Sequence, residues 1–237
     1  MKKRRTFLSL FMLASLAFVG VGYAALTRNL SVDTNLKADA NNNNLNVKFH
    51  SEIMGYKLEK GDKAKIKVGV EPIVNNQQAA SVTISGLSGY EDEVTVYLLV
   101  VNESDMSDNL HAVLTNPSIT VAHGTTNVAS DDKDGDTTNN SFTGNHFVIN
   151  AEYVYEKDIT VDGTDGEKTI TYGTMGESKT IDGKAVPYLE TKTSAEGSVG
   201  EGVWLKINYK LVNVVTDSFD VHKVTVSFSA NSTTKIA

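Results

Sequence analysis

Apolar and polar residues alternate along several stretches of the chain, and this period of two is the pattern of a half-buried β-strand. Helical periodicity is scarce by comparison, so the pattern predicts an all-β protein. The expected inward faces are Val203, Leu205, Ile207, Tyr209 and Leu211; Val224, Val226, Phe228 and Ala230; Phe147, Ile149, Ala151, Tyr153 and Tyr155; and Ala64, Ile66, Val68 and Val70.

One stretch, residues 94–101 (VTVYLLVV), is apolar at odd and even positions alike. Such a run predicts a strand that is covered on both faces. Turn signals such as Asp162-Gly163 and Asp182-Gly183 separate the predicted strands. Many strands without crossover helices indicate an antiparallel β-sandwich or barrel.

Two segments interrupt the alternation. Residues 122–144 are polar and predict a long exposed loop, whereas residues 157–200 are rich in Gly, Thr, Glu and Lys. We expect the second segment to form one or two short hairpins, through Ile159 and Val161 and through Ile170 and Tyr172, inserted into the sandwich. The predicted division is therefore an N-terminal extended segment, residues 25–40, and a β-sandwich domain, residues 41–237, that carries the insertion 157–200.

The first 24 residues have the composition of a secretory signal peptide. Four basic residues at positions 2–5 precede a charge-free run, residues 6–24, which ends with the small residues Gly22 and Ala24. We expect cleavage between Ala24 and Ala25, which predicts a secreted protein of the extracellular matrix or cell surface. The alternative is an uncleaved membrane anchor, because the run is about long enough to span a bilayer.

Charge and cysteine content narrow the function. The chain has 22 basic and 29 acidic residues, a net charge of −7, and the mature chain from Ala25 would carry −11. This balance argues against nucleic acid as a partner, since phosphate binding requires a basic face. The absence of cysteine in the 237 residues excludes disulfides, cysteine-ligated metals and thiol catalysis.

No pattern in the sequence predicts an enzyme or a cofactor. The five histidines lack the spacing of a zinc peptidase, and there is no Gly-x-Ser-x-Gly elbow. The alternating acids Asp132, Asp134 and Asp136 are a weak candidate for calcium, because the corresponding EF-hand frame ends at Ser141 instead of Glu. A solvated loop is the simpler interpretation of these three residues.

The segment that follows the expected cleavage point has a strand pattern. Four residues, Leu30, Val32, Thr34 and Leu36, alternate with polar neighbours. This strand is either the first strand of its own sandwich or a donor strand that completes the sheet of a neighbouring copy. Head-to-tail addition of the second kind does not close, so it generates filaments.

Three stretches of the sequence resemble a known family. Residues 20–27 (GVGYAALT) are similar to the signal region of SipW-dependent exported proteins, which include TasA, camelysin-like and BsaA-type biofilm matrix proteins of Gram-positive bacteria. Residues 82–87 (VTISGL) with 93–104 (EVTVYLLVVNES) resemble that family's short strand, turn and following strand, and residues 224–230 (VTVSFSA) resemble its closing strand. The likeness covers both ends and residues 80–104 well, and the middle of the chain poorly.

The resemblance implies a jelly-roll sandwich that is exported by a dedicated signal peptidase and polymerises into extracellular matrix fibres, with the donor strand falling on residues 25–38. Its partners would be further copies of itself and accessory matrix proteins, with membrane contact only through the signal peptide. Pilus-like fibres also carry Lys–Asn isopeptide bonds, for which Lys37 and Lys48 are the candidate lysines from their strand positions. Two alternatives stay open: a camelysin-like metallopeptidase and a monomeric cell-surface binding module.

Overall fold

The structure is a computed structural model of the chain. It describes residues 30–40, 45–72, 79–104, 111–122, 136–138, 140–144, 146–192, 198–213 and 222–233, all of them strands, turns and irregular segments. The side chains of 30–40, 72, 79, 122, 136–138, 222 and 223 are not described, so these residues are placed by their backbone alone.

Most of the strands form two large sheets. The first sheet has the order β13-β14-β6-β16-β1-β4-β3, and β7 pairs with β16 alongside β6. Its strands are β1 (Leu30–Ala40), β3 (Lys67–Pro72), β4 (Ala79–Leu87), β6 (His111–Leu114), β7 (Ser118–Ala122), β13 (Glu177–Ile181), β14 (Lys184–Leu189) and β16 (His222–Thr233). The second sheet has the order β2-β5-β15-β10-β9-β8. Its strands are β2 (Val47–Lys60), β5 (Glu93–Asn102), β8 (Asp136–Thr138), β9 (Ser141–Thr143), β10 (Phe147–Val154) and β15 (Gly202–Leu211).

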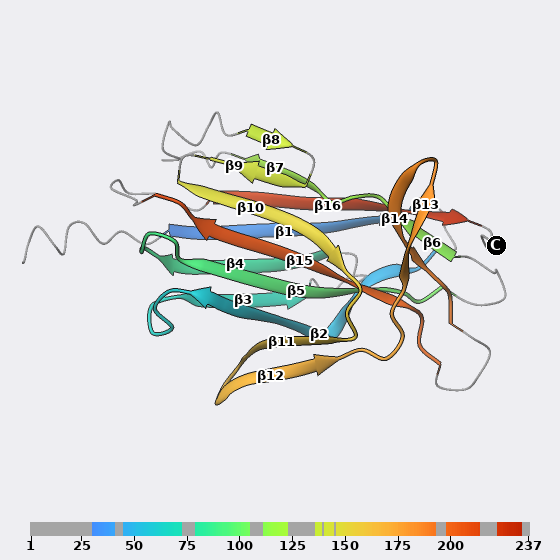
Figure 1. Cartoon of the computed structure of the whole chain (residues 1–237), viewed down its shortest axis with the longest axis horizontal. Coiled ribbons are helices and arrows are strands. Elements are labelled where there is room, and N and C mark those ends of the chain that lie inside the picture. The colour runs from blue at the N-terminus through green and yellow to red at the C-terminus, as the bar shows by residue number, and fades with distance from the viewer. Residues whose placement is uncertain are drawn as a thin grey trace, which may run out of the picture.

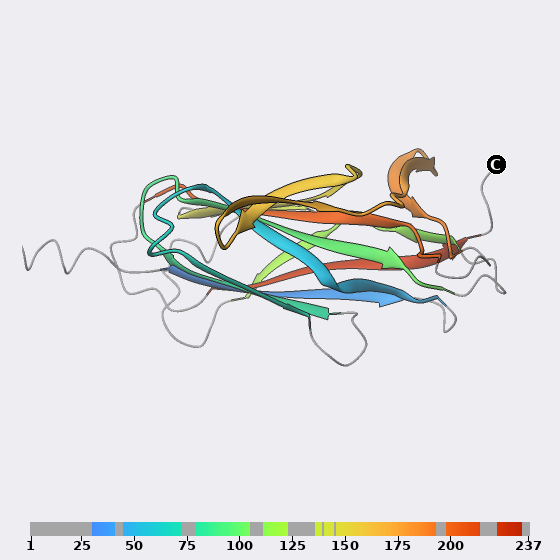
Figure 2. The same cartoon turned by 90° about the horizontal axis from the view of Figure 1, so that it is seen from below.

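The two sheets face each other across a common core, as the edge-on view in Figure 2 shows. Alternate residues of each strand point into this core because successive side chains of a strand lie on opposite faces. Phe49 of β2 meets Phe228 of β16 edge to face, with ring centroids 5.9 Å apart, and so joins the two sheets. The all-β, sandwich-like class predicted from the alternation is confirmed, whereas the jelly-roll connectivity stays a prediction.

A third, two-stranded sheet covers part of the outer face of the second sheet. It is the hairpin of β11 (Asp158–Gly163) and β12 (Gly166–Thr171). Beneath it lies a second apolar cluster, whose fully or almost fully buried members are Leu99, Val101, Ile159, Val161, Tyr172 and Trp204. This arrangement explains why β5 is apolar at both odd and even positions, since one face meets the main core and the other meets the hairpin.

The expected strand through Ala64 begins later than its alternation predicts. Residues 63–65 form a turn, in which the backbone N–H groups of Lys65 and Ile66 both donate to the Asp62 carbonyl at 3.0 Å. β3 begins only at Lys67, and of the four predicted inward residues Ala64 is exposed. The polar residues at 62, 63 and 65 belong to this turn. The alternation of polar and apolar residues therefore extends into a segment that pairs with no described strand, and the predicted start of the strand was too early.

Candidate assembly interface

The N-terminal strand β1 lies inside the first sheet, between β16 and β4 (Figure 1). We call the position bounded by β4 (Ala79–Leu87) and β16 (His222–Thr233) the β1 slot. β1 runs parallel to β16, from Val32 opposite His222 to Ala40 opposite Ala230. It runs antiparallel to β4, from Leu30 opposite Leu87 to Lys37 opposite Ala79.

The inward-facing residues on both walls of the β1 slot are fully or nearly fully buried. They are Ala80, Val82 and Ile84 on β4, and Val224, Val226, Phe228 and Ala230 on β16. The backbone register places the four candidate donor residues at the level of this apolar set. Leu36 lies in one row with Val226 and Ala80, and Thr34 in one row with Val224 and Val82.

β1 is connected to neither of its partners by a hairpin. Its antiparallel partner β4 begins at Ala79, 39 positions after Ala40 in the sequence, and its parallel partner β16 comes last of the strands in chain order. Among the described strand pairs, β1–β16 is the parallel one, and parallel pairing is slightly weaker per residue than antiparallel pairing. β1 could therefore leave its slot without opening any turn of the remaining sandwich.

The β4–β5 turn holds one end of the slot wall in place. The buried carboxylate of Asp92 accepts hydrogen bonds from the backbone N–H groups of Ser88 and Gly89 at 2.8 and 2.7 Å. Gly86 has φ +86°, and a Cβ there would lie 2.2 Å from the Lys65 carbonyl oxygen, so only glycine fits. Tyr90 at the tip of this turn is exposed, at the end of the molecule where β1 begins opposite Leu87.

A cluster of charges lies at the opposite end of the sandwich, around the candidate isopeptide residue Lys48. The Glu103 carboxylate pairs with the ammonium groups of Lys192 at 2.9 Å and Lys48 at 3.4 Å. Partial burial works to raise the pKa of Glu103, but the hydrogen bonds and charges of the two lysines outweigh it and hold that pKa below its usual range.

Asn102, next to Glu103, is completely buried and its side-chain amide is hydrogen-bonded. It donates to the Leu189 carbonyl at 3.0 Å and accepts from the Ser104 hydroxyl at 2.6 Å, which ties β5 to the end of β14. Lys48 itself lies beside the Glu103 carboxylate, and its side chain is about 23% exposed. The isopeptide assignment of Lys37 and Lys48 stays a prediction, and the side chain of Lys37 lies outside the described residues.

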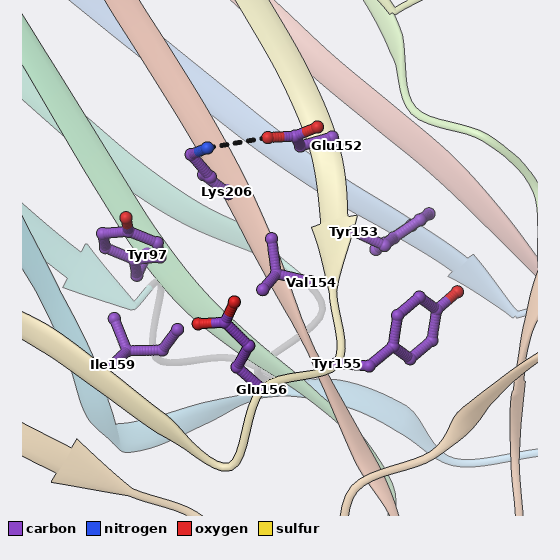
Figure 3. A pocket seen from close by; sticks show the side chains of 8 residues that line it. All are labelled: Tyr97, Glu152, Tyr153, Val154, Tyr155, Glu156, Ile159 and Lys206. Carbon is purple, nitrogen blue, oxygen red and sulfur yellow. Dashed lines mark hydrogen bonds and ion pairs between the residues drawn. The ribbon is translucent and has the colours of Figure 1, made fainter.

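An open groove of about 630 Å³ lies on the outer face of the second sheet, beside the β11–β12 hairpin (Figure 3). Lys206 and Glu152 form an ion pair at 2.7 Å on one side, and Glu156 lies on the other with Val154 between them. Ile159 and three tyrosines, Tyr97, Tyr153 and Tyr155, complete the lining, and burial raises the pKa of the Tyr97 hydroxyl. The sequence patterns did not predict this groove, because its residues come from four separate strands and one connecting segment.

The remaining predicted sites are not tested by the structure. Ala24, Ala25, Asp132 and Asp134 lie outside the described residues, and Asp136 begins β8 with its side chain undescribed. Among the described residues no group of acids and histidines is arranged to hold a metal ion. The histidines with described side chains lie apart in the chain: His50 on β2, His111 on β6 and His146 just before β10.

The described part of the chain contains no helix with the length and hydropathy needed to cross a membrane. No protein-family model matches the chain, and no curated protein shows significant sequence similarity to it.

Proposed function

We propose that this chain is a secreted structural subunit of extracellular biofilm matrix fibres, with a jelly-roll sandwich that polymerises head-to-tail by addition of the N-terminal strand. The observation that carries the proposal is the position of β1: an N-terminal strand that sits between two partners and is joined to neither by a hairpin. The same slot in a second copy offers the same ladder of backbone groups and the same apolar rows.

The energetics favour a long-lived contact. Without β1, seven buried wall residues of the slot lose the strand that lies between them. Each fully buried aliphatic side chain contributes about 1.5–3 kcal/mol relative to exposure, so an empty slot is strongly disfavoured. A fibre in which every slot is filled keeps this burial at each junction. In a chain without cysteine, strand pairing of this kind supplies durability outside the cell.

The test compares the mature chain from Ala25 with a variant that lacks residues 25–40. Electron microscopy of the mature protein should show fibres, because each copy carries both a strand and a slot. The truncated variant should not polymerise, and it should regain a stable folded state when a synthetic peptide of residues 30–40 is added. Fibres of undiminished length from the truncated variant, or a mature protein that never polymerises, would refute the proposal.

The groove of Figure 3 supports the second candidate, a monomeric cell-surface binding module, because it combines an aromatic ring with carboxylates on an open sheet face. Substitution of Tyr97→Ala and Glu156→Gln separates the two functions. Fibre assembly should be unchanged in these variants, since Tyr97 lies on β5 of the second sheet and Glu156 in the segment between β10 and β11, both away from the β1 slot. Loss of assembly in the groove variants would contradict assembly through the slot alone.

A further inference from the structure

β1 ends and β2 begins at the same end of the sandwich. Ala40 lies opposite Ala230 near the end of β16, and Val47 lies opposite Asn102 at the end of β5. Both β16 and β5 run toward this end, which is on the right in Figures 1 and 2. Leu30 lies at the other end, opposite Leu87.

The chain between the two strands is too short to reach from one end of the sandwich to the other. Four residues separate Ala40 from Leu45, and five residue steps span at most about 18 Å. The 11 residues of β1 are about 36 Å long at the rise of an extended strand. Lengthening the connection by peeling the start of β2 would draw Leu45, Val47 and Phe49 out of the core, where each is at most 4% exposed.

These lengths limit what a second copy can do. If its β1 filled the slot in the direction seen here, its own β2 would have to start within about 18 Å of the same end. The two copies would then meet through identical ends, and each could fill the slot of the other. Such an arrangement is isologous, so it closes as a pair and does not propagate.

We propose that in the fibre β1 enters the neighbouring slot in the reverse direction, antiparallel to β16 and parallel to β4. This inference rests on the proposed function. Reversal places Ala40 of the donor at the end of the acceptor where Leu30 lies in the free subunit. The donor body then follows directly at that end, so unlike ends meet and the assembly continues.

The pattern of β1 fits the slot in both directions. Alternate positions from Leu30 to Ala40 are Leu, Val, Thr, Leu, Ala and Ala, and the residues between them are Ser, Asp, Asn, Lys and Asp. A half-turn of a strand within the plane of the sheet keeps each of its positions on the same face. With Asn35 as the centre of the turn, even-numbered positions also return to places that even-numbered positions held before. The reversed strand therefore places the same alternate positions in the rows that contain the buried residues of β4 and β16.

The reversal also implies a kinetic barrier to the conversion of free subunits into fibres. A subunit whose own β1 fills its slot cannot accept a reversed strand until that strand has left. We therefore expect slow nucleation of fibres by the mature chain, followed by growth.

Introduced cysteine pairs report the direction, since the natural chain has no cysteine. Asp39 lies opposite Ser229 in the subunit, so D39C/S229C should form a disulfide within one chain and keep the oxidised protein monomeric. If the donor strand is reversed with Asn35 kept in its place, Ser31 of the donor takes the position of Asp39 and lies opposite Ser229 of the acceptor. S31C/S229C should therefore link neighbouring subunits in fibres and give a ladder on a non-reducing gel.

Two further pairs serve as controls. Asn35 lies opposite Thr225 in the subunit and keeps that place after reversal, so N35C/T225C should cross-link in both the monomer and the fibre. D33C/S229C detects a reversed strand that is shifted by two residues.

The outcomes distinguish this inference from the proposed function. For this test, fibres of each variant are grown under reducing conditions and then oxidised. If D39C/S229C links neighbouring subunits and S31C/S229C and D33C/S229C do not, reversal is wrong while fibre assembly stands. A mature protein that forms only closed pairs or remains monomeric would refute the proposed function itself. A ladder from S31C/S229C or D33C/S229C, with none from D39C/S229C, supports reversal.

Discussion

At Gly55, β2 passes directly beneath the β11–β12 hairpin. A Cβ at Gly55 would lie 2.9–3.0 Å from three side-chain atoms of Val161, which is fully buried. The absence of a side chain at Gly55 therefore allows β11 to pack closely against the second sheet. Glycine inside a strand often marks such a close approach, although the alternation along the sequence did not predict the strand in which Gly55 lies.

We expect Gly55→Ala to destabilise the protein by about 1–3 kcal/mol, because the added methyl group overpacks a closed cluster. The chain has a single tryptophan, Trp204, which is buried in that cluster, so its fluorescence reports unfolding of this region directly. Gly69→Ala on β3 is the matched control, since a Cβ there meets nothing within 4 Å. Equal stability losses in the two variants would contradict close packing at Gly55, and Val161→Ala should partly restore the Gly55→Ala variant.

Asp162 fastens the tip of the same hairpin to β2 and to the following turn. Its carboxylate accepts hydrogen bonds from the Leu58 backbone N–H and the Lys63 ammonium, both at 2.7 Å. Burial works to raise the pKa of Asp162, but these two hydrogen bonds and the lysine charge outweigh it, and the pKa is lowered. A carboxylate with a lowered folded-state pKa stabilises the protein above its unfolded value of about 3.9.

Asp162→Asn should therefore lower the free energy of unfolding at pH 7. The difference from the natural chain should disappear as the pH falls through the lowered pKa, where Asp162 itself becomes protonated. Urea unfolding followed by Trp204 fluorescence at pH 7 and at successively lower pH values, down to about 2, measures this. Lys63→Gln should show the same trend, and a difference that persists undiminished at the lower pH would exclude the ion pair as its cause.

At the scale of elements, the strand β1 should act as a separable ligand for the rest of the sandwich. A peptide of residues 30–40 should bind the variant that lacks residues 25–40. In that peptide, Leu36→Asp should weaken binding at least tenfold, because its row contains the fully buried Val226 and Ala80 and a carboxylate there loses its hydration.

The matched control is Asn35→Asp in the same peptide. Asn35 lies in a row with Thr225 and Ser81, which are half-buried and polar, so this change should alter affinity much less. Isothermal titration calorimetry distinguishes the two peptides. Similar losses for both would mean that the alternate rows are not distinguished by burial.

The alternation of single strands predicted β1, β3, β5, β10, β15 and β16, but not which strands lie beside them. It missed β2, β6 and β7, and the expectation of a long exposed loop over residues 122–144 was wrong where β8 and β9 pair. The double-sided run 94–101 correctly indicated a covered strand, and Ile159 and Ile170 correctly indicated a hairpin. The pairing of β1 with β16 could not be predicted, since it depends on contacts between the two ends of the chain. The groove near Tyr97 was missed for the same reason, because its lining comes from separate strands.

For the whole molecule, the net charge opposes assembly, whereas insertion of β1 into a neighbouring slot favours it. The mature chain from Ala25 would carry a charge of −11, so approaching copies repel each other at long range. Added salt shortens the screening length from about 30 Å at 0.01 M to about 8 Å at 0.15 M. The inward-facing wall residues of the slot are apolar and β1 pairs with both walls through its backbone, so salt should weaken the repulsion far more than the junction.

We therefore expect fibres of the mature chain to nucleate and grow faster at 0.5 M than at 0.01 M sodium chloride. Light scattering during assembly measures the rate, and electron microscopy of the end products checks that the fibres are the same. The D39C/S229C variant in its oxidised state is the control, since its own strand is held in the slot and scattering should stay flat at both salt concentrations. Slower growth at high salt would instead indicate that junctions form between opposite charges, and assembly would then depend on a surface other than the β1 slot.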